Sequence, residues 1–213
     1  FELGGQQRSG AGGWRETCHT VGRGLGAVGG AEGIHHEDIA QCGVLLGQLF
    51  VVFLLASSLA AFFNYVKNPP KIISDITPAD FGFSYEDVSF VTKDSITLRG
   101  WFVPHPSNPE GAKTIIALHG WPADKGNIFP IVSSLNQSYN LLLFDFRALG
   151  QSEGSTSTLG AREQEDLFAA IRYLKSHGID EIGVWGFSMG GAVAFMVALQ
   201  APEIRAIVAE APY

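Results

Sequence analysis

The longest apolar run in the chain covers residues 43–63, which read GVLLGQLFVVFLLASSLAAFF and contain no charged side chain. A helix of this length rises about 30 Å, which matches the thickness of the hydrocarbon core of a bilayer. A helix buried in a soluble protein would keep a polar face, and this run has only Gln48, Ser57 and Ser58 to form one. We therefore predict an uncleaved transmembrane anchor at residues 43–63.

A cleaved signal peptide is the alternative to an anchor, because Ser58, Leu59 and Ala60 resemble a small-residue processing site. Its apolar region would exceed the usual length of about 7–15 residues, and no basic patch directly precedes it. Lys67 and Lys71 follow the run, and the positive-inside rule would then keep the C-terminal part in the cytoplasm. Two lysines leave that orientation open.

The segments on either side of the run lack apolar periodicity. Residues 1–42 are rich in glycine, and such a stretch buries too little surface to offset the entropy of ordering it. We expect a disordered tail here, and a non-native origin of this tail is an open alternative because the chain begins with Phe1. The Asn-Pro-Pro sequence at 68–70 should end the helix, so we assign residues 64–79 to a linker.

From about residue 80, short apolar runs alternate with amphipathic segments. The short runs are rich in β-branched and aromatic residues, as is typical of strands, and the longer segments have apolar residues at helical spacing. Such alternation indicates a mostly parallel α/β sheet covered on both faces, with functional sites at the C-terminal strand ends. We expect strands at Tyr85–Thr92, Ile96–Val103, Lys113–Gly120, Asn140–Phe146, Glu181–Phe187 and Arg205–Glu210, and helices at Gly126–Leu135 (capped by Asn127), Leu159–Ser176 and Met189–Gln200.

Charge and cysteine content narrow the possible functions. The chain has 14 Lys and Arg against 21 Asp and Glu, so its formal net charge of -7 provides no basic surface for nucleic acid. Its two cysteines, Cys18 and Cys42, are too few for a disulfide framework or a cysteine zinc site. We therefore expect neither nucleic-acid binding nor cysteine-based metal chemistry.

One motif points to nucleophilic chemistry. The sequence Gly186-Phe187-Ser188-Met189-Gly190 matches G-x-S-x-G and lies between a predicted strand and a predicted helix. A tight strand-to-helix turn exposes the serine hydroxyl, and Gly186 and Gly190 avoid collisions with the neighbouring strand and helix. The amide dipoles of the following helix favour developing negative charge. We predict that Ser188 is a nucleophile, and the alternative is a structural Ser-Gly turn.

A second motif, His119-Gly120-Trp121, ends an earlier predicted strand. Acyl transfer needs two amide donors aimed at the oxyanion. We expect one from the residue after the nucleophile, Met189, and the other from this loop, at Trp121. The alternative is a plain turn with the tryptophan in the core. Because His119 precedes the nucleophile, we expect it to brace the loop rather than act as the base.

A third strand end carries Asp145 and Arg147, followed by a loop that contains Gly150 and Gly154. This segment could hold a substrate or brace the sheet. We expect bracing, since buried Asp–Arg pairs commonly fix loops.

In order and spacing, the segments HGW, FDFRALGQSEG and GFSMGG resemble the α/β-hydrolase superfamily. Within it, the chain is similar to serine aminopeptidase (S33-like) and Bem46-type membrane-anchored hydrolases, from about Tyr85 to Tyr213. The resemblance implies an α/β-hydrolase fold with Ser188 as the nucleophile and the backbone N–H groups of Trp121 and Met189 as the oxyanion hole. Ala148 replaces the loop glycine of the family.

The catalytic triad of that family is incomplete in this sequence. The acid and the histidine should follow the nucleophile, yet no Asp or His follows Ser188. We expect the chain to stop after the sixth strand, so that residues 80–213 are the N-terminal part of the domain and the rest of the triad lies beyond Tyr213.

These observations predict a membrane-anchored serine hydrolase that cleaves an ester, thioester or amide through an acyl-enzyme on Ser188, without a metal or cofactor. Its substrate would be a small-molecule or lipid-like ester or amide. Without a base, we expect the 213-residue piece itself to be inactive. The alternatives are a truncated or degenerate hydrolase fold that acts as a non-catalytic binding module, and a small-molecule receptor that binds without turnover.

Overall fold

The computed structural model describes the backbone of residues 36–213 and the side chains from residue 41 onward. Most of the expected disordered tail, residues 1–35, therefore lies outside the described residues. Helix α2 covers His36–Lys67 and is longer at both ends than the predicted 43–63 segment. Residues 36–42 and 64–67 are thus helical, which corrects the boundaries of the tail and the linker. A helix that has nucleated extends at little further cost.

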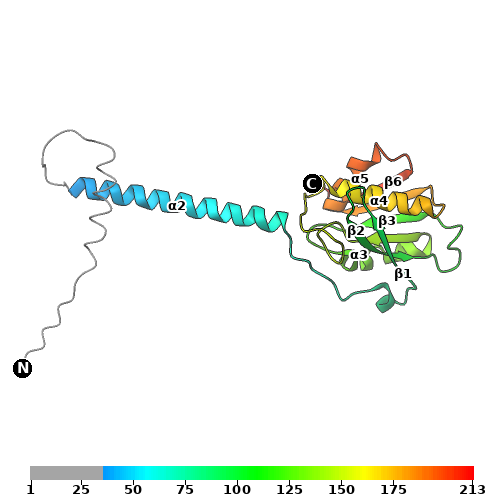
Figure 1. The fold of residues 1–213 in the computed structure, drawn as a ribbon. Helices are drawn as coiled ribbons and strands as arrows, with labels where there is room; N and C mark the ends of the chain where they lie inside the picture. The colour runs from blue at the N-terminus through cyan, green and yellow to red at the C-terminus, as the bar shows by residue number, and fades with distance from the viewer. Residues whose placement is uncertain (1–35) are drawn as a thin grey trace, which may run out of the picture. The chain divides into compact units, whose positions relative to one another are not determined.

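Helix α2, drawn from blue to cyan in Figure 1, has the length and composition of a membrane span. Its Gln41–Lys67 portion holds 27 residues with a mean hydropathy of 2.3. In the part of the chain that the structure describes, it is the one helix long and apolar enough to cross a bilayer. The helix ends at Lys67, directly before the Asn-Pro-Pro sequence, because proline cannot continue the hydrogen-bond ladder.

The chain divides into two compact units, and the second, Phe62–Tyr213, contains one six-stranded sheet (Figure 1). Its strand order is β1-β2-β4-β3-β5-β6. Strands β1 and β2 form an antiparallel hairpin, β2 is antiparallel to β4, and β4, β3, β5 and β6 run parallel. The predicted α/β architecture is confirmed. The strands cover Glu86–Val91, Thr97–Val103, Thr114–Leu118, Asn140–Phe144, Ile182–Phe187 and Ile204–Glu210.

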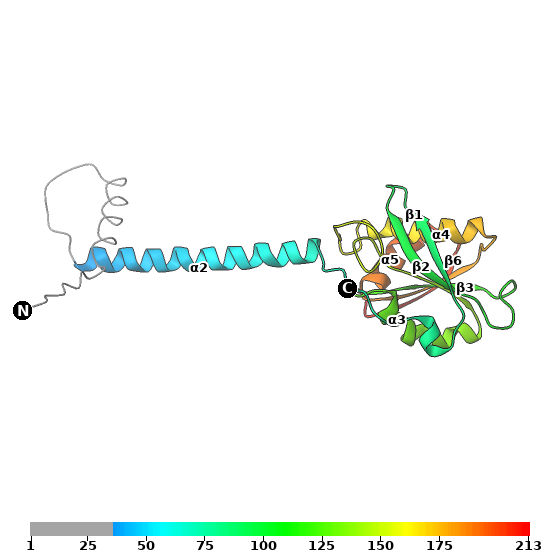
Figure 2. The same cartoon turned by 60° about the horizontal axis from the view of Figure 1, so that its bottom comes forward.

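Helices cover both faces of the sheet (Figure 2). Alternate residues of β3 divide the core: Ile116 and Leu118 pack with α4 and α5, whereas Ala117 packs with α3. Side chains point to opposite faces along a strand, so a strand buried on both faces is apolar at nearly every position. The helices are α3 (Lys125–Val132), α4 (Glu163–Ser176) and α5 (Met189–Ala198), with short 3-10 helices η1 (Pro78–Phe81) and η2 (Ser133–Gln137).

Helix α3 begins one residue earlier than predicted and has a different N-cap. The cap is Asp124 rather than Asn127, and its Oδ1 accepts the Asn127 backbone N–H at 3.0 Å. The Asn127 side-chain oxygen accepts the Asp124 N–H at 3.1 Å, which completes a reciprocal capping box. The other carboxylate oxygen of Asp124 accepts the Ser74 N–H at 2.6 Å. The cap therefore ties the segment that precedes the sheet to the start of α3.

Buried charges hold the loop that follows β4. The Arg147 side chain is 3% exposed, and its Nη2 donates to Oδ1 of the fully buried Asp166 at 2.7 Å. Its Nη1 donates to Oδ2 of Asp94, in the β1–β2 turn, at 2.8 Å. Burial raises the pKa of Asp166 to about 6, whereas hydrogen bonds from Arg147 hold the pKa of Asp94 below its usual range. The bracing role predicted for this segment is confirmed.

Asp145 braces a different pair of elements from those that Arg147 joins. Its Oδ2 accepts Lys125 Nζ at 2.7 Å and the Gln151 N–H at 2.9 Å, and its Oδ1 accepts the Lys125 N–H at 2.8 Å. The Lys125 Nζ also lies 4.7 Å from the centroid of the Trp101 ring. At Gly150 a Cβ would lie 2.3 Å from Asp145 Cγ. Asp145 therefore links the start of α3 to the loop after β4.

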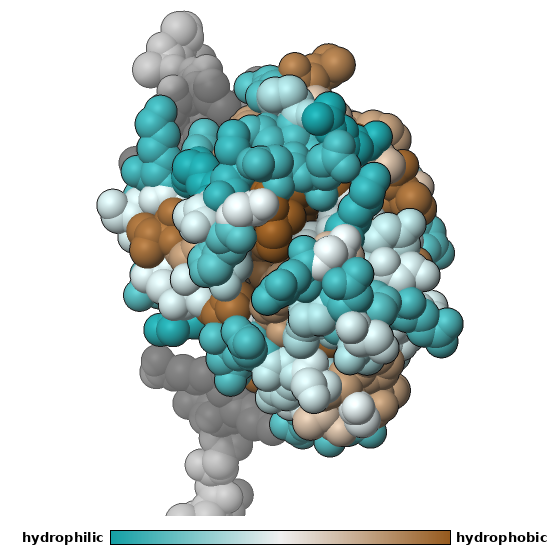
Figure 3. Space-filling view, turned by 90° about the vertical axis from the view of Figure 1, so that its right-hand side faces the viewer, coloured by the Kyte–Doolittle hydropathy of each residue, from teal (hydrophilic) through white to brown (hydrophobic). Residues whose placement is uncertain are grey.

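The surface of the second unit carries both polar and apolar regions. Figure 3 shows a largely hydrophilic face with apolar residues in a central hollow and also at its edges. Strand β6 lies at the edge of the sheet, and its Val208 is 56% exposed. Within the described residues, no further strand pairs with the outer edge of β6, which carries apolar side chains.

Replacing Asp166 with alanine should destabilise the domain strongly. The change leaves the buried Arg147 guanidinium without its main partner, and breaking a buried ion pair costs about 3–5 kcal/mol. Because Arg147 keeps its bonds to Asp94, we expect a loss of about 3 kcal/mol in the free energy of unfolding. Denaturant unfolding at pH 8, where Asp166 is ionised, measures this value.

The exposed pair between Lys113 and Glu181 provides the control for Asp166. Replacing Lys113 with alanine should leave the unfolding midpoint nearly unchanged, since solvent screens exposed pairs. Equal midpoint shifts in the two variants would contradict the bracing role of Arg147.

Candidate active site

Ser188 lies in the sharp turn between β5 and α5. Its backbone has φ 50° and ψ −116°, in the positive-φ region that side chains with a Cβ rarely adopt. Its N–H donates to the Glu210 carbonyl at 2.9 Å, and its carbonyl accepts the Ala192 N–H at 3.1 Å. The β6 strand end and the first turn of α5 therefore hold the serine in this strained conformation.

Two glycines make the turn possible because neither position has room for a side chain. A Cβ on Gly186 would lie 2.5 Å from the backbone of Gly190. A Cβ on Gly190 would lie 2.5 Å from the Leu118 carbonyl oxygen on β3. Strand β5, helix α5 and strand β3 thus meet with no side chain between them, as the G-x-S-x-G turn requires.

The loop after β3 lies beside this serine. Strands β3 and β5 are parallel neighbours with Leu118 opposite Gly186, so their C-terminal ends emerge together. A Cβ added at Gly120 would lie 3.1 Å from Ser188 Cβ and 3.2 Å from Phe187 Cδ1. The structure therefore brings the His119–Trp121 loop against the serine turn.

Of the two residues predicted to form the oxyanion hole, Met189 directly follows Ser188, and Trp121 follows Gly120 in the loop beside the serine turn. Met189 is fully buried and is the first residue of α5, where the N–H groups lack partners within the helix. Among the described residues, no hydrogen bond is made by the backbone N–H of Trp121. Within the described residues, both N–H groups are therefore without a hydrogen-bond partner. Their role as oxyanion donors remains a prediction.

His119 braces the loop rather than facing the serine. Its Nε2 accepts the Phe146 backbone N–H at 3.0 Å, so its Nδ1 carries the proton and donates to the Gly120 carbonyl at 2.7 Å. The ring is 1% exposed, and burial lowers the pKa of His119. A neutral imidazole with both nitrogens engaged cannot accept a proton from Ser188.

The described residues provide no other partner for the serine hydroxyl. The other histidines whose side chains are described, His105 and His177, hydrogen-bond to Gln137 and Tyr173. No hydrogen bond joins the side chain of Ser188 to a histidine or carboxylate within the described part of the chain. Nor do His, Cys, Asp and Glu side chains there form a cluster of three that could hold a metal ion.

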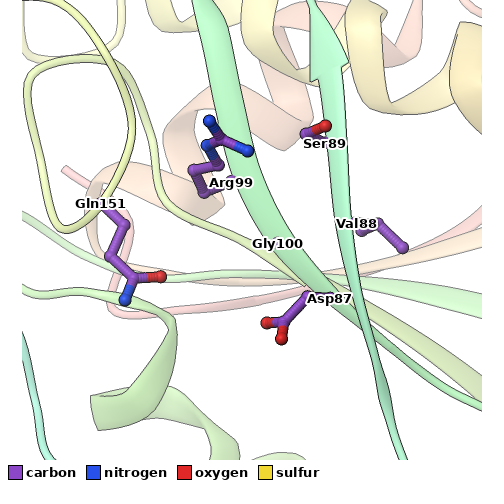
Figure 4. Close-up of a pocket in the computed structure, with 6 residues that line it drawn as sticks. All are labelled: Asp87, Val88, Ser89, Arg99, Gly100 and Gln151. Carbon is purple, nitrogen blue, oxygen red and sulfur yellow. The ribbon is translucent and has the colours of Figure 1, made fainter.

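A separate polar hollow of about 370 Å³ lies on the β1–β2 hairpin (Figure 4). Asp87, Ser89 and Arg99 from these strands and Gln151 from the loop after β4 line it. Ser188 is not among its lining residues. This hollow is therefore distinct from the serine turn.

Tyr65 and Lys125 contribute to the site region, and the sequence pattern alone identified neither of them. The Tyr65 ring, in the last turn of α2, makes an edge contact with the Trp121 ring, with centroids 5.6 Å apart. Lys125 pairs with the buried Asp145. No motif or spacing links residues 65 and 121, so only the folded structure reveals this contact.

Comparison with protein families places this site in a known fold. Residues 113–212 match the family model described as "alpha/beta hydrolase fold". This region includes both the loop after β3 and the serine turn.

Curated relatives extend the similarity. The protein bem46 of Schizosaccharomyces pombe is 32% identical over 142 residues, which are 63% of this chain and 46% of bem46. A polyketide transferase, grgF of a Penicillium species, is 32% identical over 59% of this chain and 44% of its own length. The chain spans about half the length of the curated relatives it matches.

Solved structures share the architecture. An esterase from Pyrococcus furiosus is similar with a TM-score of 0.63 and 38% identity, over 68% of this chain and 58% of the esterase. The mostly parallel sheet with helices on both faces is consistent with the fold that the family model names. The chain therefore has the α/β-hydrolase fold.

Proposed function

We propose that the whole protein is a serine hydrolase that forms an acyl-enzyme on Ser188. The observation that carries the proposal is the positive-φ turn between β5 and α5, with Gly186 and Gly190 packed against their neighbours without a Cβ. The similarity to an esterase supports hydrolysis of an acyl bond. Residues with a strained backbone conformation cluster at active sites. The strained conformation of Ser188 is therefore consistent with a hydroxyl that is exposed for reaction.

In the proposed reaction, Ser188 Oγ attacks the carbonyl carbon of an ester, thioester or amide. The serine proton passes to a base, and negative charge develops on the carbonyl oxygen. The N–H groups of Trp121 and Met189 donate to this oxyanion, and each such donor typically lowers the barrier by about 3–4 kcal/mol. The leaving group departs with the proton, and water then releases the acyl group from the serine.

The general base in this proposal is a histidine oriented by an acid. His119 is engaged on both nitrogens, so it does not fill this role. In the α/β-hydrolase order the acid and the histidine follow the nucleophile, and no Asp or His follows Ser188 in the sequence here. The proposed mechanism therefore assigns both groups to the remainder of the whole protein.

The proposed location is a membrane, with residues 43–63 as a single-pass anchor inside helix α2. Small-molecule or lipid-like esters and amides are the proposed substrates. A non-catalytic binding module on the same fold is the rival function, because the described residues offer Ser188 no base.

Replacing Ser188 with alanine in the full-length protein should lower kcat for ester hydrolysis by about 10⁴-fold or more. Turnover of a p-nitrophenyl ester measures the loss. Ser155, an exposed serine in the loop before α4, provides the matched control. Its alanine variant should keep wild-type activity, and retained turnover in the Ser188 variant would exclude the acyl-enzyme.

Replacing Gly190 with alanine should distort the serine turn. The new Cβ would meet the Leu118 carbonyl oxygen at 2.5 Å, and overpacking of this kind costs about 1–3 kcal/mol in stability. We expect a lower melting temperature together with a lower kcat. Gly47 has no atom near its would-be Cβ, so its alanine variant should match the wild type. An active, equally stable Gly190 variant would contradict the packing of the turn.

Adding charge to the apolar helix tests the anchor. Lysine at both Leu49 and Phe53 should release the protein from membranes, since each charge at a helix centre costs about 2.5–3.5 kcal/mol of insertion. Alkaline carbonate extraction of cell membranes distinguishes integral from released protein. Alanine at the same positions should leave the protein in the pellet. Carbonate release of the wild type would contradict the anchor.

A further inference from the structure

The last turn of helix α2 contacts the loop that carries the predicted oxyanion donor. The rings of Tyr65 and Trp121 meet edge to face, at an interplanar angle of 89°. Both residues belong to the second compact unit, Phe62–Tyr213. Such an aromatic pair contributes about 0.5–1.5 kcal/mol beyond the area it buries.

Two further hydrogen bonds fix the same stretch of chain to the domain. The Lys67 carbonyl, at the end of α2, accepts the Ser157 N–H at 2.8 Å. The Lys71 ammonium donates to the Ser152 carbonyl. Residues 65–71 are therefore held by the loop that precedes α4, which keeps Tyr65 in a defined position.

The Trp121 side chain is trapped between this turn and the core. It packs against the hydrophobic core that lies under α4 and α5. Its indole Nε1 is buried and has no hydrogen-bond partner in the described residues. A buried donor without a partner costs about 1–3 kcal/mol. Apolar packing around the indole must therefore offset this cost.

The loop around Trp121 is held on its other side by His119. The imidazole bonds to the Phe146 N–H and the Gly120 carbonyl, which fixes the strand end. The Ala123 N–H donates to the Gly120 carbonyl at 3.1 Å, which closes a tight turn around Trp121. Within the described residues, Tyr65 makes the one aromatic contact to the indole.

We propose that Tyr65 is a positioning residue for the oxyanion hole, which rests on the proposed function of Ser188. Its ring holds the Trp121 indole against the core and thereby fixes the direction of the Trp121 backbone N–H. In this proposal the C-terminal end of the apolar helix orients the loop that carries the oxyanion donor, in addition to connecting the domain to the anchor. Small displacements of a catalytic group reduce rates strongly, since the donor must reach the oxyanion at about 2.7–3.1 Å.

The test compares Tyr65→Ala, Tyr65→Phe and Phe63→Ala in the full-length protein in detergent. Phe63 lies in the same helix end, is 61% exposed, and its ring contacts that of Phe62. For Tyr65→Ala we expect kcat for a p-nitrophenyl ester to fall about tenfold, a partial loss compared with removal of a whole donor. KM should change by less than about twofold, because the oxyanion forms only in the transition state.

The inhibition constant Ki of a trifluoromethyl ketone provides a second measurement. If Tyr65 had a purely structural role, replacing it would leave this Ki unchanged. Ser188 Oγ adds to the carbonyl carbon of the ketone, the serine proton passes to the base, and the oxygen becomes an oxyanion. Its Ki should rise in parallel with the loss in kcat in Tyr65→Ala. Tyr65→Phe keeps the ring edge and should restore both values, and Phe63→Ala should match the wild type.

The possible outcomes separate this inference from the proposed function. If the wild type and Tyr65→Ala have equal kcat and Ki, Tyr65 does not position the donor, whatever its effect on melting temperature or membrane insertion. If Phe63→Ala loses as much as Tyr65→Ala, the effect belongs to the helix end in general and the inference fails. A wild type without turnover or ketone binding would instead overturn the proposed function.

Discussion

The close approach of three backbones at Ser188 is the constraint on which the site depends. Strand β5, helix α5 and strand β3 meet at Gly186 and Gly190, where an added Cβ would lie 2.5 Å from neighbouring backbone atoms. This contact fixes the serine at φ 50°. It also brings the end of β3, and with it Gly120 and Trp121, beside the serine. Removing either glycine would therefore disturb the serine and the loop together.

Buried charges stabilise the loops around that contact. Arg147 joins α4 to the β1–β2 turn, and Asp145 joins the start of α3 to the loop after β4. His119 contributes as a neutral hydrogen-bonding group because burial lowers its pKa. These groups resemble catalytic residues in type, but their hydrogen bonds are all used within the scaffold. Among the residues discussed, this leaves Ser188 and the backbone N–H groups of Met189 and Trp121 for the proposed chemistry.

The sequence predicted the fold class well because the apolar runs have strand and helix periods. It also predicted the serine turn, since G-x-S-x-G between a strand and a helix is typical of a tight turn whose glycines avoid backbone collisions. Helix α2 extends beyond the apolar run at both ends, because polar residues can continue a helix once it has formed. The cap of α3 is Asp124 rather than Asn127, and either residue type favours such a position. The contacts of Tyr65 and Lys125 join residues distant in the sequence, which no periodicity encodes.

Mass spectrometry of the full-length protein mixed with an activated ester and quenched in acid tests the central proposal most directly. We expect an acyl group on the peptide that contains Ser188, with stoichiometry that rises and falls within one turnover. An acyl group on any other residue, or none during measurable turnover, would contradict the proposed acyl-enzyme.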